Sequence, residues 1–358
     1  MTVAVHPCDL PEIGSTDFFN RLALSANDTS ALPLAATWEL TPRCNLRCHQ
    51  CYLPVPPSAP SDLSLPDALR LLDTLAENGV LFLLMTGGEF TLHPHWPQLY
   101  QQARKCGFLV TLMTNATRID DLFIRELTQL PPRRIEATVY GFTAATYDQV
   151  TGVPGSHARF QAGVARIRQA GLPLELKMLV LQSNVHEFDL IRRWTADEGI
   201  PFRYDAIINP RLDGNLGPAA DRLPPTLLAK WLQSHPSPGS ASASPTTPPL
   251  PPPSPPVSKP LFTCGAGIRT LHLDSTGGAH PCMMWRWDPL DTRSSNWARD
   301  WKNHIARIRR QPAPGNSRCE GCLQRSRCFT CPALSRLETG TAGMPVDYFC
   351  QVMEKKVE

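Results

Sequence analysis

The chain of 358 residues lacks the features that would commit it to a membrane or to nucleic acid. No apolar run reaches the roughly 18 residues of a membrane span, and the N-terminus has no charged, apolar and small-residue succession typical of a secretory signal. A net charge of only +3, without a long basic run, argues against nucleic acid and anionic lipid as partners. We therefore expect a cytoplasmic protein with no nucleic-acid partner and no membrane partner.

Cysteine is missing from residues 107–263, although the chain contains 12 cysteines. Three of them fall within residues 44–51 and seven within residues 264–350. A disulfide framework would be spread more evenly, and disulfides are rare in a reducing compartment. The clustering therefore favours metal–sulfur sites over disulfides.

Residues 35–233 alternate apolar runs with segments of helical periodicity. Strands are predicted at 35–41, 80–86, 108–114, 135–140, 172–181 and 202–208, and helices at 67–78, 95–106, 120–129, 158–170 and 186–198. Such alternation predicts a parallel α/β sheet. Six units predict a partial (β/α)6 TIM-like barrel, with the active face at the carboxyl ends of the strands. Residues 1–34 are expected to form an N-terminal extension.

A compositional break separates this barrel from the C-terminal part. Residues 234–260 are rich in Pro and Ser and cannot bury a core, so we expect a disordered linker or insertion. The alternative is a proline-rich docking site for a partner. Residues 261–358 form a short, cysteine-rich domain that we expect to be held together by metal.

Cys44, Cys48 and Cys51 follow directly after the first predicted strand. Three thiolates can reach three of the four irons of a cubane, which normally takes four thiolates. The open iron would be a position for a reactant. Zinc is the alternative, but zinc ribbons use paired Cys-x-x-Cys rather than a triplet.

This CxxxCxxC triplet resembles the signature of the radical S-adenosylmethionine (SAM) superfamily. The resemblance implies a 4Fe–4S cluster that binds SAM and cleaves it reductively to a 5′-deoxyadenosyl radical, which abstracts a hydrogen atom from the substrate. It also implies a flavodoxin- or ferredoxin-type electron donor. Gln50 stands where the family usually has an aromatic residue or His near the adenine, and Tyr52 or His49 is expected to compensate.

Gly87, Gly88 and Glu89 follow the second predicted strand and resemble the family's GGE motif. The resemblance implies that the backbone and the Glu89 carboxylate receive the SAM ammonium group. Glycine allows the close backbone approach that such a contact needs.

Polar residues at later strand ends are further candidates for SAM binding. In the family, residues at corresponding strands contact the SAM ribose and carboxylate, which implies this role for Asn115, Thr138 and Lys177. The alternative is structural, because polar groups in buried strands need hydrogen-bond partners.

The seven C-terminal cysteines resemble a SPASM domain, an extension that binds two auxiliary iron–sulfur clusters of the 4Fe–4S type. The resemblance divides them into two sets: Cys319, Cys322, Cys328 and Cys350 for one cluster, and Cys264, Cys282 and Cys331 for the other. The second set lacks a fourth thiolate, so our hypothesis is an open or non-cysteine position. A single zinc site is the alternative, but its four ligands would leave three cysteines unexplained.

The combined resemblance implies post-translational modification of a peptide or protein, such as a crosslink, as in maturases of ribosomally synthesised peptides. The residues before the first strand are too few for a leader-binding domain, so we expect either a separate leader-peptide-binding protein or leader binding at another surface of this chain. Trp285, Arg286 and Trp287 are candidates for peptide contact, with burial under the clusters as the alternative.

Three other functions stay open at this point. One is a radical SAM enzyme for a small molecule such as a tetrapyrrole precursor. Another is an anaerobic sulfatase-maturing enzyme, against which Met283 counts because those enzymes have Asp after the corresponding cysteine. The last is a non-catalytic iron–sulfur scaffold or electron carrier, against which the intact triplet and GGE motif count.

Overall fold

The computed structural model describes residues 32–54, 62–235, 261–314, 318–319, 322–325 and 328–355. Residues 1–31 of the expected extension and residues 236–260 of the Pro/Ser-rich segment lie outside the described residues. No helix within the described ranges combines the length and the apolar composition needed to cross a bilayer.

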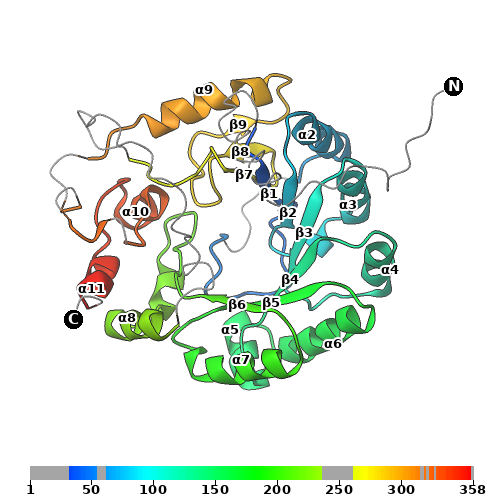
Figure 1. Ribbon diagram of the computed structural model, residues 1–358, viewed down its shortest axis with the longest axis horizontal. Coiled ribbons are helices and arrows are strands. Elements are labelled where there is room, and N and C mark those ends of the chain that lie inside the picture. The colour runs from blue at the N-terminus through cyan, green and yellow to red at the C-terminus, as the bar shows by residue number, and fades with distance from the viewer. Residues whose placement is uncertain are drawn as a thin grey trace, which may run out of the picture.

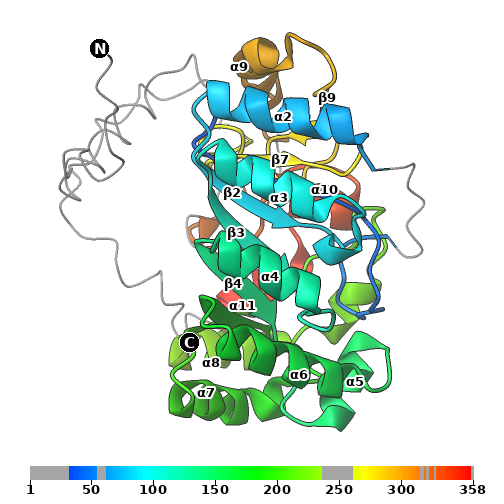
Figure 2. The same cartoon turned by 90° about the vertical axis from the view of Figure 1, so that its right-hand side faces the viewer.

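Six parallel strands form the curved sheet at the centre of the molecule (Figure 1). They pair in chain order: β1 Ala35–Glu39, β2 Phe82–Thr86, β3 Leu109–Thr114, β4 Arg134–Thr138, β5 Leu174–Leu179 and β6 Phe202–Asp205. The predicted helices between them are α2 Leu65–Glu77, α3 Trp96–Lys105, α4 Asp121–Gln129, α6 Ser156–Gln169 and α7 Phe188–Asp197. Figure 2 shows α2, α3, α4 and α6 stacked along one side of the sheet. The predicted partial TIM-like barrel is confirmed.

Local signals explain where these helices begin. In α2, the Ser64 side chain accepts from the amide of Asp67 at the helix N-terminus, and the buried residues recur at helical spacing (Ala68, Leu71, Leu72 and Leu75). Among the described residues of the barrel part, two helices were not predicted, α5 Ala144–Thr151 and α8 Pro225–Ser234. Three short 3₁₀ helices complete this part, η2 Phe90–Leu92, η3 Val185–Glu187 and η4 Gly217–Asp221.

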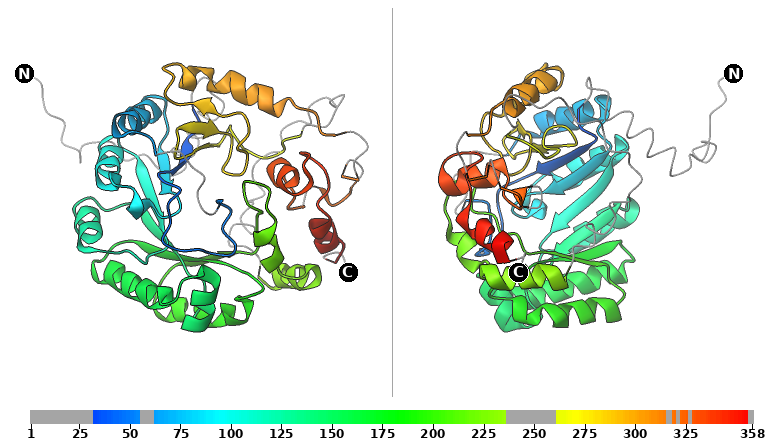
Figure 3. Two further views of the ribbon diagram at one scale, coloured as in Figure 1. Left: turned by 180° about the vertical axis from the view of Figure 1, so that it is seen from behind. Right: turned by 60° about the vertical axis from the view of Figure 1, so that its left-hand side comes forward.

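The C-terminal part continues the barrel sheet. Strand β7 Thr270–Leu273 pairs in parallel with β1, and β8 Gly278–His280 and β9 Leu290–Asp291 add antiparallel strands, giving the order β6-β5-β4-β3-β2-β1-β7-β8-β9. The remaining helices are α9 Trp297–Arg309, α10 Pro332–Thr339 and α11 Asp347–Lys355. Figures 1 and 3 show α10 and α11 on the opposite side of the molecule from α3 and α4, and α9 beside β9.

The two faces of the sheet differ in polarity, because successive strand residues point to opposite sides. One face packs against the helices through buried apolar residues (Trp38, Leu83, Leu112, Ile135 and Leu176). The other face carries Glu39 beside Thr86, Glu136 beside Glu175, and Lys177 beside Arg203. The interior of the partial barrel is therefore polar and charged.

Candidate active site

The loop that carries the three N-terminal cysteines is held by the end of α5. The backbone amides of Arg47 and His49 donate to the carbonyl oxygens of Thr151 (2.8 Å) and Val150 (3.1 Å). Gly152 ends the helix with φ 66°, and a Cβ there would lie 2.8 Å from the Arg47 carbonyl oxygen. Glycine alone tolerates both this backbone and this approach. Helix α5 thus positions the loop.

Cys44, Cys48 and Cys51 line one cavity of about 160 Å³, together with Gly88. Burial raises the pKa of all three thiols, that of Cys44 to about 11, and the neighbouring thiols raise those of Cys44 and Cys48 further. Ionising thiols so close together therefore requires a positive countercharge, which the irons of a cluster supply. The residues present fit a 4Fe–4S cluster bound through three cysteines.

A single metal ion fits the described residues less well than a cluster does. Within the ranges that the structure describes, no three His, Cys, Asp or Glu side chains are arranged to hold one ion. Zinc draws its thiolates to about 2.3 Å from one centre, whereas a cubane distributes them over separate irons.

The Gly87-Gly88 pair lets the end of β2 approach the start of the cysteine loop. The Gly88 amide donates to the Thr41 carbonyl oxygen at 2.8 Å, and the Glu89 amide donates to that of Arg43 at 2.8 Å. A Cβ on Gly87 would lie 2.4 Å from the Thr41 oxygen, and one on Gly88 would lie 2.4 Å from the Arg43 oxygen. Both glycines are therefore required for this backbone contact.

The Glu89 side chain points to the end of β3. Its carboxylate accepts from the Thr114 hydroxyl (2.9 Å) and the Asn115 amide (2.7 Å), and burial raises its pKa. The Asn115 carboxamide in turn donates to Asn45 (3.0 Å) and lies 3.8 Å from the Cys44 sulfur. The fold thus brings two predicted SAM-binding residues, Glu89 and Asn115, to the cysteine loop.

Thr138 and Lys177 lie side by side on the interior face of β4 and β5. The Lys177 ammonium lies 3.2 Å from the Met113 sulfur, and no carboxylate among the described residues forms an ion pair with it. Burial and the nearby Arg203 lower its pKa. Lys177 is thus an interior cation that an anionic ligand can approach.

A closed ion-pair network lies next to Lys177 on the interior face. Arg203 pairs with Glu136 and, at 2.9 Å, with Glu175, while Arg134 pairs with Glu175 and approaches Glu136 at 3.7 Å. Two guanidinium groups and two carboxylates neutralise one another here. Lys177 forms no ion pair with either carboxylate of this network.

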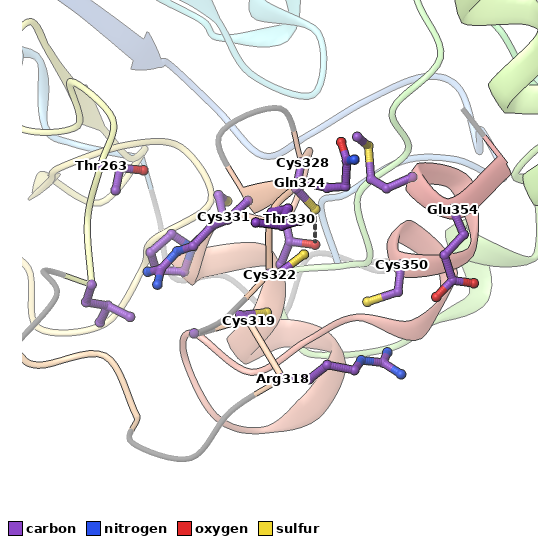
Figure 4. A pocket seen from close by; sticks show the side chains of 16 residues that line it. Thr263, Arg318, Cys319, Cys322, Gln324, Cys328, Thr330, Cys331, Cys350 and Glu354 are labelled. Carbon is purple, nitrogen blue, oxygen red and sulfur yellow. Dashed lines mark hydrogen bonds between the residues drawn. The ribbon is translucent and has the colours of Figure 1, made fainter. Parts of the chain in front are cut away.

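A second and larger cavity of about 860 Å³ contains most of the C-terminal cysteines (Figure 4). Cys319, Cys322, Cys328, Cys331 and Cys350 all line it. Burial raises the pKa of Cys319, and the thiols of Cys350, Cys328 and Cys322 raise it further. The structure therefore brings together the four cysteines that the resemblance assigns to one auxiliary cluster.

The other three C-terminal cysteines also lie near one another. Burial raises the pKa of Cys282, and Cys331 and Cys264 raise it further. The one other cysteine in the described ranges, Cys106, lies beside Asp73 on the helical side of the barrel, with its sulfur 3.5 Å from the Asp73 carboxylate. Within those ranges this set has no fourth cysteine, so a non-cysteine position stays a prediction.

Sequence reasoning missed the buried Glu39 at the end of β1. Its Oε1 accepts from the Tyr52 hydroxyl (2.9 Å) and from the Arg286 guanidinium (2.6 Å), and His272 Nε2 lies 3.6 Å away. Burial alone would raise the pKa of Glu39, but His272 and Arg286 lower it to about 2. A charged residue that ends an apolar strand just before the cysteine loop was the available signal.

Two tryptophans after Cys282 pack inside the C-terminal part. Trp285 is 1% exposed, and its ring lies 4.9 Å from that of Phe262 and 5.0 Å from that of Trp287. The Arg336 guanidinium stacks 4.1 Å from the Trp287 ring centre. Trp285 therefore takes the buried alternative rather than peptide contact.

Comparison with known proteins matches the barrel to a known family. Residues 38–194 match the family model described as Radical SAM superfamily. An AdoMet-dependent heme synthase of Methanosarcina barkeri is 30% identical over 43% of this chain and 45% of its own length. The antilisterial bacteriocin subtilosin biosynthesis protein AlbA of Bacillus subtilis is 25% identical over 76% of this chain and 60% of its own length. In both comparisons the chain thus spans less than two thirds of the relative.

Two further matches extend over most of this chain. An AdoMet-dependent heme synthase of Oleidesulfovibrio alaskensis is 23% identical over 92% of this chain and 90% of its own length. The crystal structure of Streptococcus suis SuiB bound to precursor peptide SuiA has the same fold, with a TM-score of 0.67, 13% identity, and coverage of 97% of this chain and 84% of SuiB. The cysteine triplet, the partial barrel and the family match agree, so residues 38–194 are a radical SAM domain.

Proposed function

We propose that this enzyme abstracts a hydrogen atom from a peptide and thereby installs a post-translational modification such as a crosslink. The fold similarity to SuiB, which was solved with a precursor peptide, supports this most, because it covers 97% of the chain and so includes the C-terminal cysteines. The similarity to AlbA, a bacteriocin biosynthesis protein, points to the same substrate class.

The chain's own residues hold and shield the reacting groups. A 4Fe–4S cluster on the triplet would supply the one-electron reduction that cleaves SAM. Cys44, Cys48 and Cys51 would hold the cluster, and Glu89 and Asn115, which lie next to the cysteine loop, would bind SAM beside it. Lys177 supplies a positive charge for a carboxylate group inside the barrel. The helices outside and the C-terminal part across the opening exclude water from the radical.

The two C-terminal cysteine sets would hold auxiliary iron–sulfur clusters that accept or relay electrons. The electron for SAM cleavage would come from a flavodoxin- or ferredoxin-type protein. A separate protein would bind the leader of the peptide substrate. Each of these partners can be tested by adding it to the purified enzyme.

The decisive experiment incubates the anaerobically reconstituted enzyme with SAM, a reductant and candidate precursor peptides encoded beside its gene. A mass change in one peptide, together with 5′-deoxyadenosine, supports the proposal. The Cys44→Ala, Cys48→Ala, Cys51→Ala triple variant should lose both products. Unchanged 5′-deoxyadenosine in that variant would refute the assigned cluster site.

A small-molecule substrate of the tetrapyrrole type is the second candidate. The match to a heme synthase over 92% of this chain and 90% of that protein favours it. An iron porphyrin that carries propionate groups is the probe, in the same assay. Conversion of the porphyrin, with every candidate peptide unchanged, would replace the peptide proposal.

A further inference from the structure

One carboxylate oxygen joins the two halves of the candidate site. The Tyr52 hydroxyl and the Arg286 guanidinium both donate to Oε1 of Glu39, at 2.9 and 2.6 Å. Glu39 is only 4% exposed. Hydrogen bonds that involve a charged donor or acceptor are the stronger kind, and breaking one partner of a buried ionic pair is costly. These two hydrogen bonds therefore link the N-terminal and C-terminal parts firmly. We call Glu39 with its two donors the joint, and the side chains of Tyr52 and Arg286 its two arms.

Each arm of the joint leads directly to a cysteine. Tyr52 immediately follows Cys51 of the N-terminal triplet. Arg286 leaves a tight turn that begins at Cys282, in which the Trp285 amide donates to the Cys282 carbonyl oxygen at 3.2 Å. The Arg286 side chain also donates back to the Met283 carbonyl oxygen at 2.7 Å, which fixes its direction.

The surroundings leave the joint little freedom to move. Glu39 ends β1, which is paired in register with β2 on one side and with β7 on the other. The Leu212 amide donates to the Tyr52 carbonyl oxygen at 2.9 Å, which holds the first arm at its backbone. The buried, packed Trp285 holds the turn of the second arm.

We propose that Glu39 is a positioning residue that sets the separation between the SAM-binding cluster and the auxiliary cluster of Cys264, Cys282 and Cys331. The rate of electron transfer between two centres falls steeply with their separation. A joint that fixes this separation therefore also fixes the rate of electron transfer between the clusters. The inference rests on the proposed function only in needing both clusters. It does not depend on whether the substrate is a peptide.

The test measures the magnetic interaction between the two clusters in reconstituted holoenzyme reduced with dithionite, by electron paramagnetic resonance and without substrate. In the unchanged protein we expect one defined interaction. Glu39→Ala should weaken this interaction or spread it over a range of strengths, because Tyr52 and Arg286 both lose their hydrogen-bond acceptor. Glu39→Gln should largely restore it, because the amide oxygen still accepts from both arms.

Two milder variants, Tyr52→Phe and Arg286→Met, keep the test valid where Glu39→Ala fails to fold. Tyr52→Phe removes one hydroxyl and should widen the range of interaction strengths between the two clusters, while the iron content stays the same. Tyr348→Phe is the matched control, because its hydroxyl donates to Leu223 at 2.7 Å, away from the joint. We expect no change in the interaction for this control.

An unchanged interaction in fully loaded Tyr52→Phe and Arg286→Met would overturn the inference. Failure of the proposed auxiliary cluster would give a different result: the Cys282→Ala, Cys331→Ala variant would then keep the iron content and the spectrum of the unchanged protein. The two failures are therefore distinguishable.

Discussion

The carboxamide nitrogen of Asn115 lies 3.8 Å from the sulfur of Cys44 and 3.0 Å from the carboxamide oxygen of Asn45. A donor that faces a cluster sulfur stabilises the reduced, more negative state and raises the reduction potential. We expect Asn115→Ala to make the potential of the SAM-binding cluster more negative and to weaken SAM binding. A redox titration followed by electron paramagnetic resonance measures the shift.

A control separates this contact from the rest of the loop. The Asn45 carboxamide also donates to the Thr117 hydroxyl, at 2.8 Å, so Asn45→Ala disturbs the same loop but leaves the donor at the sulfur. We expect a smaller shift for Asn45→Ala. Equal shifts in the two variants would show that loop order, rather than the donor, sets the potential.

Gly87→Ala should prevent the cysteine loop from closing against β2. The added Cβ would lie 2.4 Å from the Thr41 carbonyl oxygen, and the backbone φ is +148°. Gly79→Ala is the matched control, because its φ of +84° is also positive but a Cβ there meets nothing within 4 Å. We expect Gly87→Ala to lose iron and SAM binding and Gly79→Ala to keep both. Equal iron content in the two variants would show that the added Cβ on residue 87 does not prevent the cysteine loop from closing.

The two C-terminal cysteine sets predict separable losses of iron. A Cys319→Ala, Cys322→Ala variant should lose about four irons per chain, and so should a Cys282→Ala, Cys331→Ala variant, because each cubane contains four irons. Cys106→Ala should lose none, because that thiol lies beside Asp73. Iron counting after anaerobic reconstitution measures these losses. A loss of about eight irons in either double variant would show that the sets are not independent.

Much of the barrel follows from periodicity. The predicted strand at 108–114 is β3 Leu109–Thr114, and the predicted helix at 120–129 is α4 Asp121–Gln129. Helix α5 was missed because its eight residues show little apolar periodicity. Its signals were the cap at Thr143 and the stop at Gly152, which are weaker than a repeating apolar face.

The candidate site, like the barrel, was predicted from the sequence only in part. The resemblance to short family motifs predicted the cysteines and Glu89. Spacing could not predict that Glu39 and Arg286 meet, because their contact depends on β7 pairing with β1 across most of the chain. Tyr52 was predicted near adenine, and the structure gives its hydroxyl to Glu39.

His272 should make the protein less stable in acid. Burial lowers the pKa of His272 from 6.5 to about 4. Between these two pH values the unfolded chain therefore binds more protons than the folded chain. The contribution of neutral His272 to the stability of the fold is thus complete above pH 6.5 and is lost as the pH falls toward 4. The shift corresponds to about 3 kcal/mol of unfolding free energy. Anaerobic urea unfolding at several pH values measures this slope.

Substitution of His272 isolates its part of that slope. His272→Leu should flatten the dependence on pH between 6.5 and 4. The ring of His186 is 63% exposed, so His186→Leu is the control and should leave the slope unchanged. A slope that stays the same in His272→Leu would assign the acid sensitivity to other groups.

Lys177→Met should weaken the binding of a carboxylate inside the barrel. The ammonium has no ion-pair partner among the described residues, while the neighbouring Arg203 is neutralised by Glu136 and Glu175. A hydrogen bond to a charged group contributes about 1.5–3 kcal/mol, so we expect the Kd for SAM to rise about 10- to 100-fold. Equilibrium dialysis with reconstituted enzyme measures it, and Lys230→Met on the outer helix α8 is the control. If SAM binding stays the same but turnover is lost, Lys177 binds a carboxylate of the substrate instead, because the same interior cation would then act after SAM is bound.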